Sequence, residues 1–531
     1  MDTVTGQKWL IGIFSTLIIV VLMIVAGVEM EKTRLRRPEI EISSSTRDCI
    51  HCHEKQGVAP KLVEEWKLSE HAEMGIGCIE CHEAQEGEWD AMRCPESRVV
   101  IGKHPTPKDC QGCHETQVKE FANSKHVLSQ SFMALKGTDR NVFEPTVATK
   151  HGCEQCHHIG NYWPDQSIGE CDACHSKHRF DIAQARHSET CGECHIGPDH
   201  PHIEIFLESK HGNIYSTFAS DYDWDYEPGE PVTFTGPTCA TCHMSGTLTN
   251  DHFTHNVSDR LTWESQAPFS VRTQEYWGGF SWQEKRRRME GVCYQCHARS
   301  FVDRYLLTAD LCNLLYNEIW EATIKWMRLL RQHDVVKTDK FEFEGKAITG
   351  WPVVGYDEEQ EHIAYKNWHH EGRRFRHGAE MMGADYTQWH GIWELQENLA
   401  KLIQYGAEHG VPEARMWRES KDPNKFMKLY PLYDIPGGSW GPSAMALRGD
   451  MAMDRIPDYW ETIYSNVKAA HENDLLTEKQ WDLYTKLYEN REAEIGRQFD
   501  LPELHQELMD TLNYDLKELY KRQKVELTSF K

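Results

Sequence analysis

Residues 171–195 read CDACHSKHRFDIAQARHSETCGECH, and this stretch decides how the whole chain is interpreted. It contains the pattern Cys-x-x-Cys-His twice, at Cys171, Cys174 and His175 and again at Cys191, Cys194 and His195. The pattern occurs eight times in the 531 residues and takes up 16 of the 18 cysteines. The other six copies are Cys49, Cys52, His53; Cys78, Cys81, His82; Cys110, Cys113, His114; Cys153, Cys156, His157; Cys239, Cys242, His243; and Cys293, Cys296, His297.

Cys-x-x-Cys-His is the attachment motif of c-type haem. The two thiols form thioether bonds with the vinyl groups of one haem, and the adjacent histidine is the proximal ligand of its iron. A disulfide scaffold and zinc ribbons are the alternatives. Zinc would pair the Cys-x-x-Cys units at regular spacings and would not require a histidine after each. The sequence therefore predicts eight covalently attached c-type haems.

The composition agrees with a chain that binds large apolar cofactors. Only 39% of the residues are hydrophobic, which is low for a chain of this length, while Trp, Tyr and Phe number 18, 20 and 18. Macrocycles that supply their own apolar bulk would compensate for a small side-chain core. The formal net charge of -25 argues against a nucleic-acid partner, because phosphate binding needs a basic surface.

The N-terminus contains 19 uncharged, mostly apolar residues at 10–28. This length is at the lower limit for a membrane span and exceeds the apolar region of most cleaved signals, so we expect an uncleaved anchor. Lys32, Arg34, Arg36 and Arg37 follow the segment, and by charge alone they would place the rest of the chain in the cytoplasm. Covalent c-type haem is installed outside the cytoplasmic membrane, so we expect the body of the protein there, in the periplasm or its equivalent.

A second repeat concerns histidines outside the motifs. It consists of an aromatic residue, two further residues, Ser, one residue and His. Three copies follow it, and IAQARH at 182–187 is a weaker relative with alanine in the serine position. Electron-transfer haems take a second axial ligand, often histidine. The repeat predicts as distal ligands His71 (WKLSEH, 66–71), His126 (FANSKH, 121–126), His211 (FLESKH, 206–211) and His187.

Beyond the last motif the chain changes character. Apolar residues recur with helical spacing at 311–332, 391–408, 458–498 and 502–523. Leu402, Tyr405 and similar residues are expected in a core or a subunit interface, and 340–355 is expected to form a local turn or a short hairpin. The predicted fold class is mainly α, with a haem-packed multihaem cytochrome c region at 45–300 and a helical C-terminal domain at 301–531. These follow an N-terminal tail at 1–9, a membrane helix at 10–28 and a linker at 29–44.

From residue 45 onward the sequence resembles the octahaem hydroxylamine oxidoreductase family. The resemblance rests on the eight motifs with a helical half after them, on NDHFTH at 250–255, and on GRRFRHGAEMMGADYTQWHG at 372–391. It implies that the fourth haem, held by Cys153, Cys156 and His157, is catalytic and keeps an open iron position for a small nitrogen compound.

The resemblance also implies roles for histidines near these two stretches. Asp251 and His252 match an Asp-His pair over the open haem, where they would move protons; the alternative is a turn and a surface histidine. His255, His377 and His390 would be distal ligands. With the four histidines of the repeat, they make seven distal ligands for the seven other haems.

The direction of the reaction depends on a tyrosine. In oxidising members of the family, a tyrosine from a neighbouring subunit of the trimer is bound covalently to the catalytic haem, and members without it resemble reductases of nitrite or hydroxylamine. Nothing in the local sequence selects among Tyr430, Tyr433, Tyr459 and Tyr464. We expect a homotrimer working in the reductive direction. Its redox partner would be a cytochrome c or a membrane quinol-linked cytochrome.

Two other functions fit the same motifs. A pure electron-transfer cytochrome would have a distal ligand on every haem, and His151 or His158, beside the fourth motif, would close the open position. A reductase of a sulfur oxyanion could use the same scaffold, since a fold does not fix a substrate.

Overall fold

The structure is a computed structural model, and it describes residues 42–94, 99–129, 151–226, 234–247, 253–273, 279–337, 340–343, 346–349 and 357–422, together with Lys468, Trp481 and Thr485. The chain forms two compact units. The first unit comprises Met1–His104 and Ser176–Asp181, and the second comprises Pro105–His175 and Ile182–Lys531. A domain boundary near residue 300 stays a prediction, but a long helix begins beside it, at Arg299.

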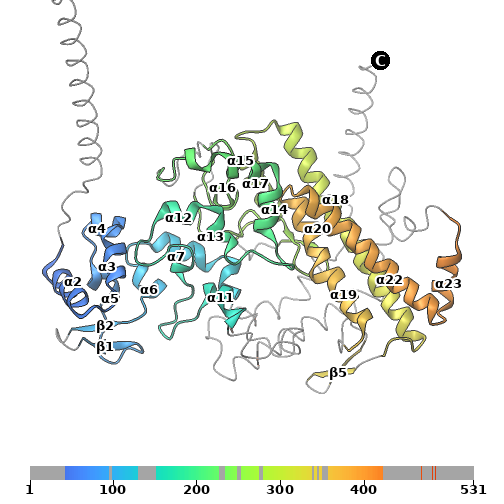
Figure 1. Ribbon diagram of the computed structural model, residues 1–531, viewed down its shortest axis with the longest axis horizontal. Helices are drawn as coiled ribbons and strands as arrows, with labels where there is room; N and C mark the ends of the chain where they lie inside the picture. The colour runs from blue at the N-terminus through green and yellow to red at the C-terminus, as the bar shows by residue number, and fades with distance from the viewer. Residues whose placement is uncertain are drawn as a thin grey trace, which may run out of the picture. The chain divides into compact units, whose positions relative to one another are not determined.

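The described part of the first unit consists of short helices and one two-stranded sheet (Figure 1). The first described helix starts at a cap, where the Ser43 hydroxyl accepts from the backbone N–H of Thr46. It ends at Gly57, whose φ of 64° is the left-handed conformation that favours glycine after a helix. The elements are α2 (Ser44–Gln56), α3 (Pro60–Lys67), α4 (Glu70–Glu73), α5 (Cys78–His82), β1 (Ala91–Arg93) and β2 (Val100–Gly102), the strands pairing antiparallel.

The part of the second unit that precedes residue 299 is also made of short elements. Helices of one or two turns are marginal by themselves, so packing against other groups must hold them. The elements are α6 (Pro107–Cys110), α7 (Glu115–Ala122), η1 (Lys125–Leu128), α11 (Glu154–His157), η2 (His158–Gly160), η3 (Cys171–Ala173), α12 (Ile182–Arg186), α13 (Ser188–Gly192), α14 (His202–Glu208), α15 (Lys210–Phe218), η4 (Ala219–Asp221), α16 (Cys239–His243), β3 (Trp263–Glu264), β4 (Val271–Arg272) and α17 (Trp282–Cys293).

Long helices dominate the rest of the described chain. Helix α18 (Arg299–Gln332) has 34 residues, and α19, α20 and α22 pack along it (Figure 1). The remaining elements are β5 (Lys340–Phe343), β6 (Lys346–Thr349), α19 (Glu359–His369), α20 (Glu371–Glu380), α21 (Ala384–Thr387), the π-helix η5 (Gln388–Trp393), α22 (Glu394–Glu408) and α23 (Pro412–Glu419).

The largest described hydrophobic core lies between these long helices. Trp320 and Leu330 of α18 and Leu399 and Leu402 of α22 are completely buried in it, and Tyr405 packs against it. Two smaller clusters of described residues lie in the haem-dense part, one around Trp66 and one around Phe206, Tyr215 and Tyr222. The side-chain core is therefore concentrated where there are no haem motifs, as the low hydrophobic content predicts.

A buried polar network joins α18 to β3, β4 and α20. The Asp310 carboxylate accepts two bonds of 3.0 Å from the Arg272 guanidinium and one of 2.6 Å from the Trp263 indole. Nearby, Glu380 accepts from the Asn313 amide at 2.9 Å and from the Ser265 hydroxyl at 3.2 Å. Burial raises the pKa of Glu380 to about 7.

The sequence-based fold expectations compare well with this structure. The helices expected at 311–332 and 391–408 are found as part of α18 and as α22, and the expected hairpin is the antiparallel pair β5–β6. The helices expected at 458–498 and 502–523 lie outside the described residues, except for Lys468, Trp481 and Thr485. The apolar segment 10–28 also lies outside them. In the described part of the chain, no helix combines the length and hydropathy of a membrane span.

Leu402→Ala should destabilise the helical core. The side chain is fully buried among α18 and α22 residues, and removing it should cost about 2–5 kcal/mol through lost burial and a residual cavity. Thermal unfolding followed by far-UV circular dichroism measures the loss. Lys401→Ala on the exposed side of the same helix is the control, and equal melting temperatures of the two variants would contradict the core assignment.

Relative to the wild type, the Glu380→Gln variant should be more stable at pH 8 than it is at pH 5. Because burial raises the folded-state pKa of Glu380 from 4.5 to about 7, the unfolded chain ionises first as pH rises, and the wild type loses stability between these values. The loss amounts to about 3 kcal/mol at most. Gln carries no charge at either pH. The difference in melting temperature between variant and wild type should grow from pH 5 to pH 8, with Glu397→Gln on the surface measured alongside, and a difference for Glu380→Gln that does not change with pH would refute the argument.

Candidate functional site

Each Cys-x-x-Cys-His motif places its three functional groups on one side of a helical turn. In five motifs the histidine N–H donates to the carbonyl of the first cysteine at 2.9–3.0 Å, which closes the turn. Residues i, i+3 and i+4 of such a turn share a face, so both thiols and the imidazole point the same way. The five bonds link Cys110 with His114, Cys153 with His157, Cys171 with His175, Cys191 with His195, and Cys293 with His297.

Hydrogen bonds fix the tautomer of three motif histidines. Nδ1 of His53, His82 and His157 lies 3.0, 2.8 and 2.6 Å from the backbone carbonyls of Val58, Gly102 and Ser129. A carbonyl can only accept, so Nδ1 carries the proton and the Nε2 lone pair is available to a metal. This is the arrangement that ligating histidines adopt in metalloproteins.

His195 of the sixth motif has a different partner. Its Nδ1 lies 2.9 Å from Nδ1 of His202, whose ring centroid is 4.4 Å from that of His377. Burial lowers the pKa of His195 to about 3 and those of His126 and His243 to about 4. These imidazoles are therefore neutral at pH 7, which is the form that binds a metal.

Thiols of different motifs lie next to one another. With the motifs numbered in chain order, neighbouring cysteine sulfurs connect motif 1 to 2, motif 3 to 5, motif 4 to 6, and motif 6 to 7. Motifs 5 and 6, and motifs 7 and 8, are close enough for their thiols to interact electrostatically. We call the series 3–5–6–7–8 the motif row; motif 4 meets it at motif 6. The neighbouring pairs are Cys49–Cys78, Cys110–Cys171, Cys156–Cys194 and Cys191–Cys239.

Four motif histidines face a second histidine at a distance that suits a shared iron. A metal–imidazole bond is about 2 Å long, so two rings on opposite sides of one metal have centroids about 6 Å apart. The observed centroid distances are 6.3 Å for His82–His178, 6.1 Å for His126–His195, 6.4 Å for His175–His255 and 6.0 Å for His211–His297.

The predicted distal ligands His126, His211 and His255 are thus brought next to motif histidines. His178 is a candidate that the sequence reasoning missed. It belongs to Ser176–Asp181, the segment that returns to the first unit, where it faces His82. Its position three residues after His175 shows only that it cannot reach the other side of the same iron, and it does not indicate which other motif it meets.

The other predicted distal ligands have different neighbours. His71 lies edge-on to Phe180, with centroids 5.4 Å apart. His187 stacks on Trp224 at 3.8 Å. His377 is buried beside His202, whereas the half-exposed His390 has its ring nitrogens 3.4 Å from the Asp385 carboxylate and 3.6 Å from the Glu394 carboxylate. Their roles as ligands stay predictions.

The serine of the second repeat has a structural function. The hydroxyls of Ser69, Ser124 and Ser209 each donate 2.7 Å to the carbonyl of the aromatic residue three positions earlier. Ser69 and Ser209 also accept from the N–H three residues later, at 3.1 Å. The serine ends one helix and starts the next turn, so it fixes where the following histidine projects. The alanine copy departs from this, since His187 itself occupies the cap position.

The residues predicted to be catalytic at motif 4 are only partly described. His157 is described, but Asp251 and His252 lie outside the described residues, as do Tyr430, Tyr433, Tyr459 and Tyr464. The described segment resumes at Phe253, whose ring stands at 90° to that of His255.

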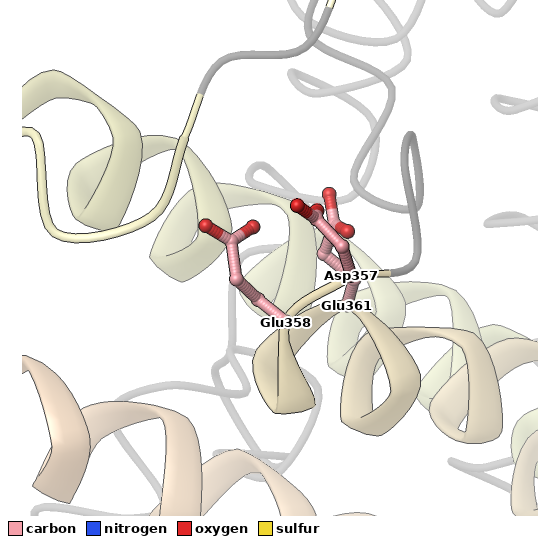
Figure 2. A group of neighbouring side chains, drawn as sticks. All are labelled: Asp357, Glu358 and Glu361. Carbon is pink, nitrogen blue, oxygen red and sulfur yellow. The ribbon is translucent and has the colours of Figure 1, made fainter.

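An acidic group at the start of α19 was also not anticipated. The carboxylates of Asp357, Glu358 and Glu361 point to one side of the first turn (Figure 2). Asp357 pairs with Lys337 at 2.9 Å, and the buried Glu361 pairs with Arg331 at 2.6 Å. These two cations offset two of the three carboxylates, and Glu358 accepts from the backbone N–H of Lys337 at 3.1 Å, so the group is an ion-pair network between α19 and the C-terminal end of α18 with the residues after it.

The residues present fit covalent c-type haem. Paired thiols share a face with an imidazole whose Nδ1 is already bonded, and further imidazoles stand opposite at the distance of a bis-histidine iron. Zinc ribbons need neither feature.

Comparison with known proteins agrees with this reading. The family model described as seven times multi-haem cytochrome CxxCH matches residues 45–325, the range that contains all eight motifs. A curated relative is the probable nitrite reductase-hydroxylamine oxidoreductase fusion protein of Kuenenia stuttgartiensis, 29% identical over 314 residues that cover 49% of this chain and 35% of the relative. The chain therefore spans about a third of that relative's length.

Two solved structures have a similar fold. One, a hypothetical multiheme protein, gives a TM-score of 0.61 at 21% identity and covers 72% of this chain and 97% of its own. The other, a reducing HAO-like protein complex of Kuenenia stuttgartiensis, gives a TM-score of 0.54 at 20% identity over 70% of this chain and 86% of its own.

His178→Ala should remove the second axial ligand of the iron bound by His82. One low-spin ferric signal should be lost and one high-spin signal gained in the electron paramagnetic resonance spectrum, with unchanged haem content. His104→Ala, in the same unit but stacked on Trp89, is the matched control. An unaltered spectrum of the His178 variant would exclude His178 as a ligand.

Proposed function

The chain belongs to the family of multihaem cytochromes described as seven times multi-haem cytochrome CxxCH, and we propose that it is an octahaem enzyme that reduces nitrite or hydroxylamine at one open haem. Seven bis-histidine haems would relay electrons to that haem. The substrate class is supported by the name of the Kuenenia stuttgartiensis relative, a probable nitrite reductase-hydroxylamine oxidoreductase fusion protein. The reductive direction is supported by the fold shared with a reducing HAO-like complex.

The observation that carries the proposal is the position of motif 4. Its Cys156 sulfur lies beside that of Cys194 of motif 6, so motif 4 meets the motif row at an inner member. A group attached at motif 4 can exchange electrons with the row through motif 6. In motif 6 itself, His195 faces a second histidine, His126, which is the arrangement of an electron carrier.

The chemistry needs protons as well as electrons. When bound, the fourth haem would supply an iron position for the nitrogen compound and a path for electrons. His157 would hold that iron through Nε2, since its Nδ1 is bonded to the Ser129 carbonyl at 2.6 Å. His252 would give a proton to the substrate, and Asp251 would hold the imidazole in the tautomer that can do so.

The setting of the enzyme completes the proposal. Segment 10–28 would anchor the chain, with the haem-bearing part outside the cytoplasmic membrane. A cytochrome c or a quinol-linked membrane cytochrome would supply the electrons, and the acidic net charge of -25 would favour a basic partner surface. The assembly would be a homotrimer.

The alternative with most support is a pure electron-transfer cytochrome, because four histidine pairs already have bis-histidine spacing. The ferric spectrum separates the two functions. The enzyme requires a high-spin signal that disappears when cyanide binds, whereas a chain with eight six-coordinate haems gives none, and its absence would overturn the proposal.

Asp251→Asn and His252→Asn should lower the turnover of nitrite and hydroxylamine. Loss of a positioned proton donor costs roughly 10²–10⁴-fold in rate. Assays with a reduced viologen as electron donor measure this, with haem content and the high-spin signal unchanged. His362→Asn, an exposed histidine of α19, is the control. Full activity of both variants would remove the Asp-His pair from the mechanism.

The direction of catalysis has a separate test. Haem staining of a boiled denaturing gel at the mass of a covalent oligomer would indicate a tyrosine link between subunits, and the proposal would change to hydroxylamine oxidation. Staining at the mass of a single chain agrees with reduction.

A further inference from the structure

Two hydrogen bonds join His157 and Ser129 in both directions. Nδ1 of His157 donates to the Ser129 carbonyl at 2.6 Å, and the Ser129 hydroxyl donates to the His157 carbonyl at 2.8 Å. The first bond orients the imidazole ring. The second ties the backbone of the motif to Ser129, the residue that provides the acceptor. The Ser129 carbonyl therefore cannot move away from the ring without breaking this second hydrogen bond.

The turn that carries Ser129 is held firmly against motif 4. A Cβ added to Gly160 of η2 would lie 2.5 Å from the Ser129 hydroxyl and 2.5 Å from the His126 carbonyl, so the two turns are in close backbone contact. The Tyr162 hydroxyl donates to the Val127 carbonyl at 2.9 Å. At the far end of the turn, the N–H of Lys125 donates to the buried Ser258 hydroxyl at 2.9 Å.

We infer that Ser129 is a positioning residue for the catalytic haem, which it controls through His157. A carbonyl that accepts from Nδ1 makes the imidazole a stronger electron donor to iron, and second-shell bonds of this kind tune metal sites. Stronger donation stabilises the oxidised iron, so Ser129 keeps the reduction potential of this haem low. The inference rests on the proposed function for one point, that motif 4 carries the open haem.

The same turn also serves motif 6. His126, three residues before Ser129, faces His195 with ring centroids 6.1 Å apart. One short turn therefore contributes the acceptor for the axial histidine of motif 4 and an imidazole opposite that of motif 6. The hydroxyl of Ser129 fixes the end nearer to motif 4, and Ser258 fixes the end nearer to His126.

The experiment compares Ser129→Ala, Ser129→Thr and Ser258→Ala in the full-length holoprotein. A redox titration followed by electron paramagnetic resonance gives the potential of the high-spin haem, and resonance Raman gives its ferrous iron–histidine stretch. Ser129→Ala should raise the potential and lower the stretching frequency. Ser129→Thr keeps the hydroxyl and should match the wild type, as should Ser258→Ala, which removes a buried hydroxyl from the other end of the turn.

The outcomes separate this inference from the proposed function. Wild-type potential and stretch in Ser129→Ala would overturn the role of Ser129. A shift in a low-spin haem, with the high-spin haem unchanged, would support the link between Ser129 and His157 but overturn motif 4 as the open site. If Ser129→Ala does not accumulate with full haem content, Ser129→Gly removes the same hydroxyl and should shift both values in the same direction.

Discussion

One helical turn, repeated eight times, is the constraint on which the rest of the structure depends. Because Cys, Cys and His stand at positions i, i+3 and i+4, each turn presents two thiols and an imidazole in one direction. Everything around the turns serves that geometry: carbonyls of Val58, Gly102 and Ser129 select the tautomer, and neighbouring turns approach until their thiols touch. The side-chain core, by contrast, lies in the long helices after residue 299.

The sequence was most informative where a local rule applies. The motifs, the mainly helical fold, the helix at 311–332 and the hairpin at 340–355 depend on neighbours within a few residues, and all could be predicted. The aromatic–Ser–His repeat also proved to be local, because the serine hydroxyl bridges two successive helical turns within six residues. The copy with alanine in the serine position lacks that bridge, and there the His187 ring stacks on Trp224.

What could not be predicted depends on contacts between distant parts of the chain. Nothing in the neighbourhood of residue 178 shows that it lies opposite His82, nearly a hundred residues away, and periodicity says nothing about which motifs are neighbours in space. The ion-pair network of Asp357, Glu358 and Glu361 with Lys337 and Arg331 is also tertiary. The role of Ser129 escaped notice because its acceptor is a backbone carbonyl, which every residue possesses.

The discontinuity of the first unit has a consequence for how the protein is made. The chain leaves this unit after His104 and supplies its last segment only at Ser176–Asp181. The segment that faces His82 is therefore synthesised only after the whole of residues 105–175. Until then the first unit lacks the part of its chain that contains His178, however early its own two motifs are made. Completion of the first unit consequently waits for a segment that is encoded within the sequence range of the second.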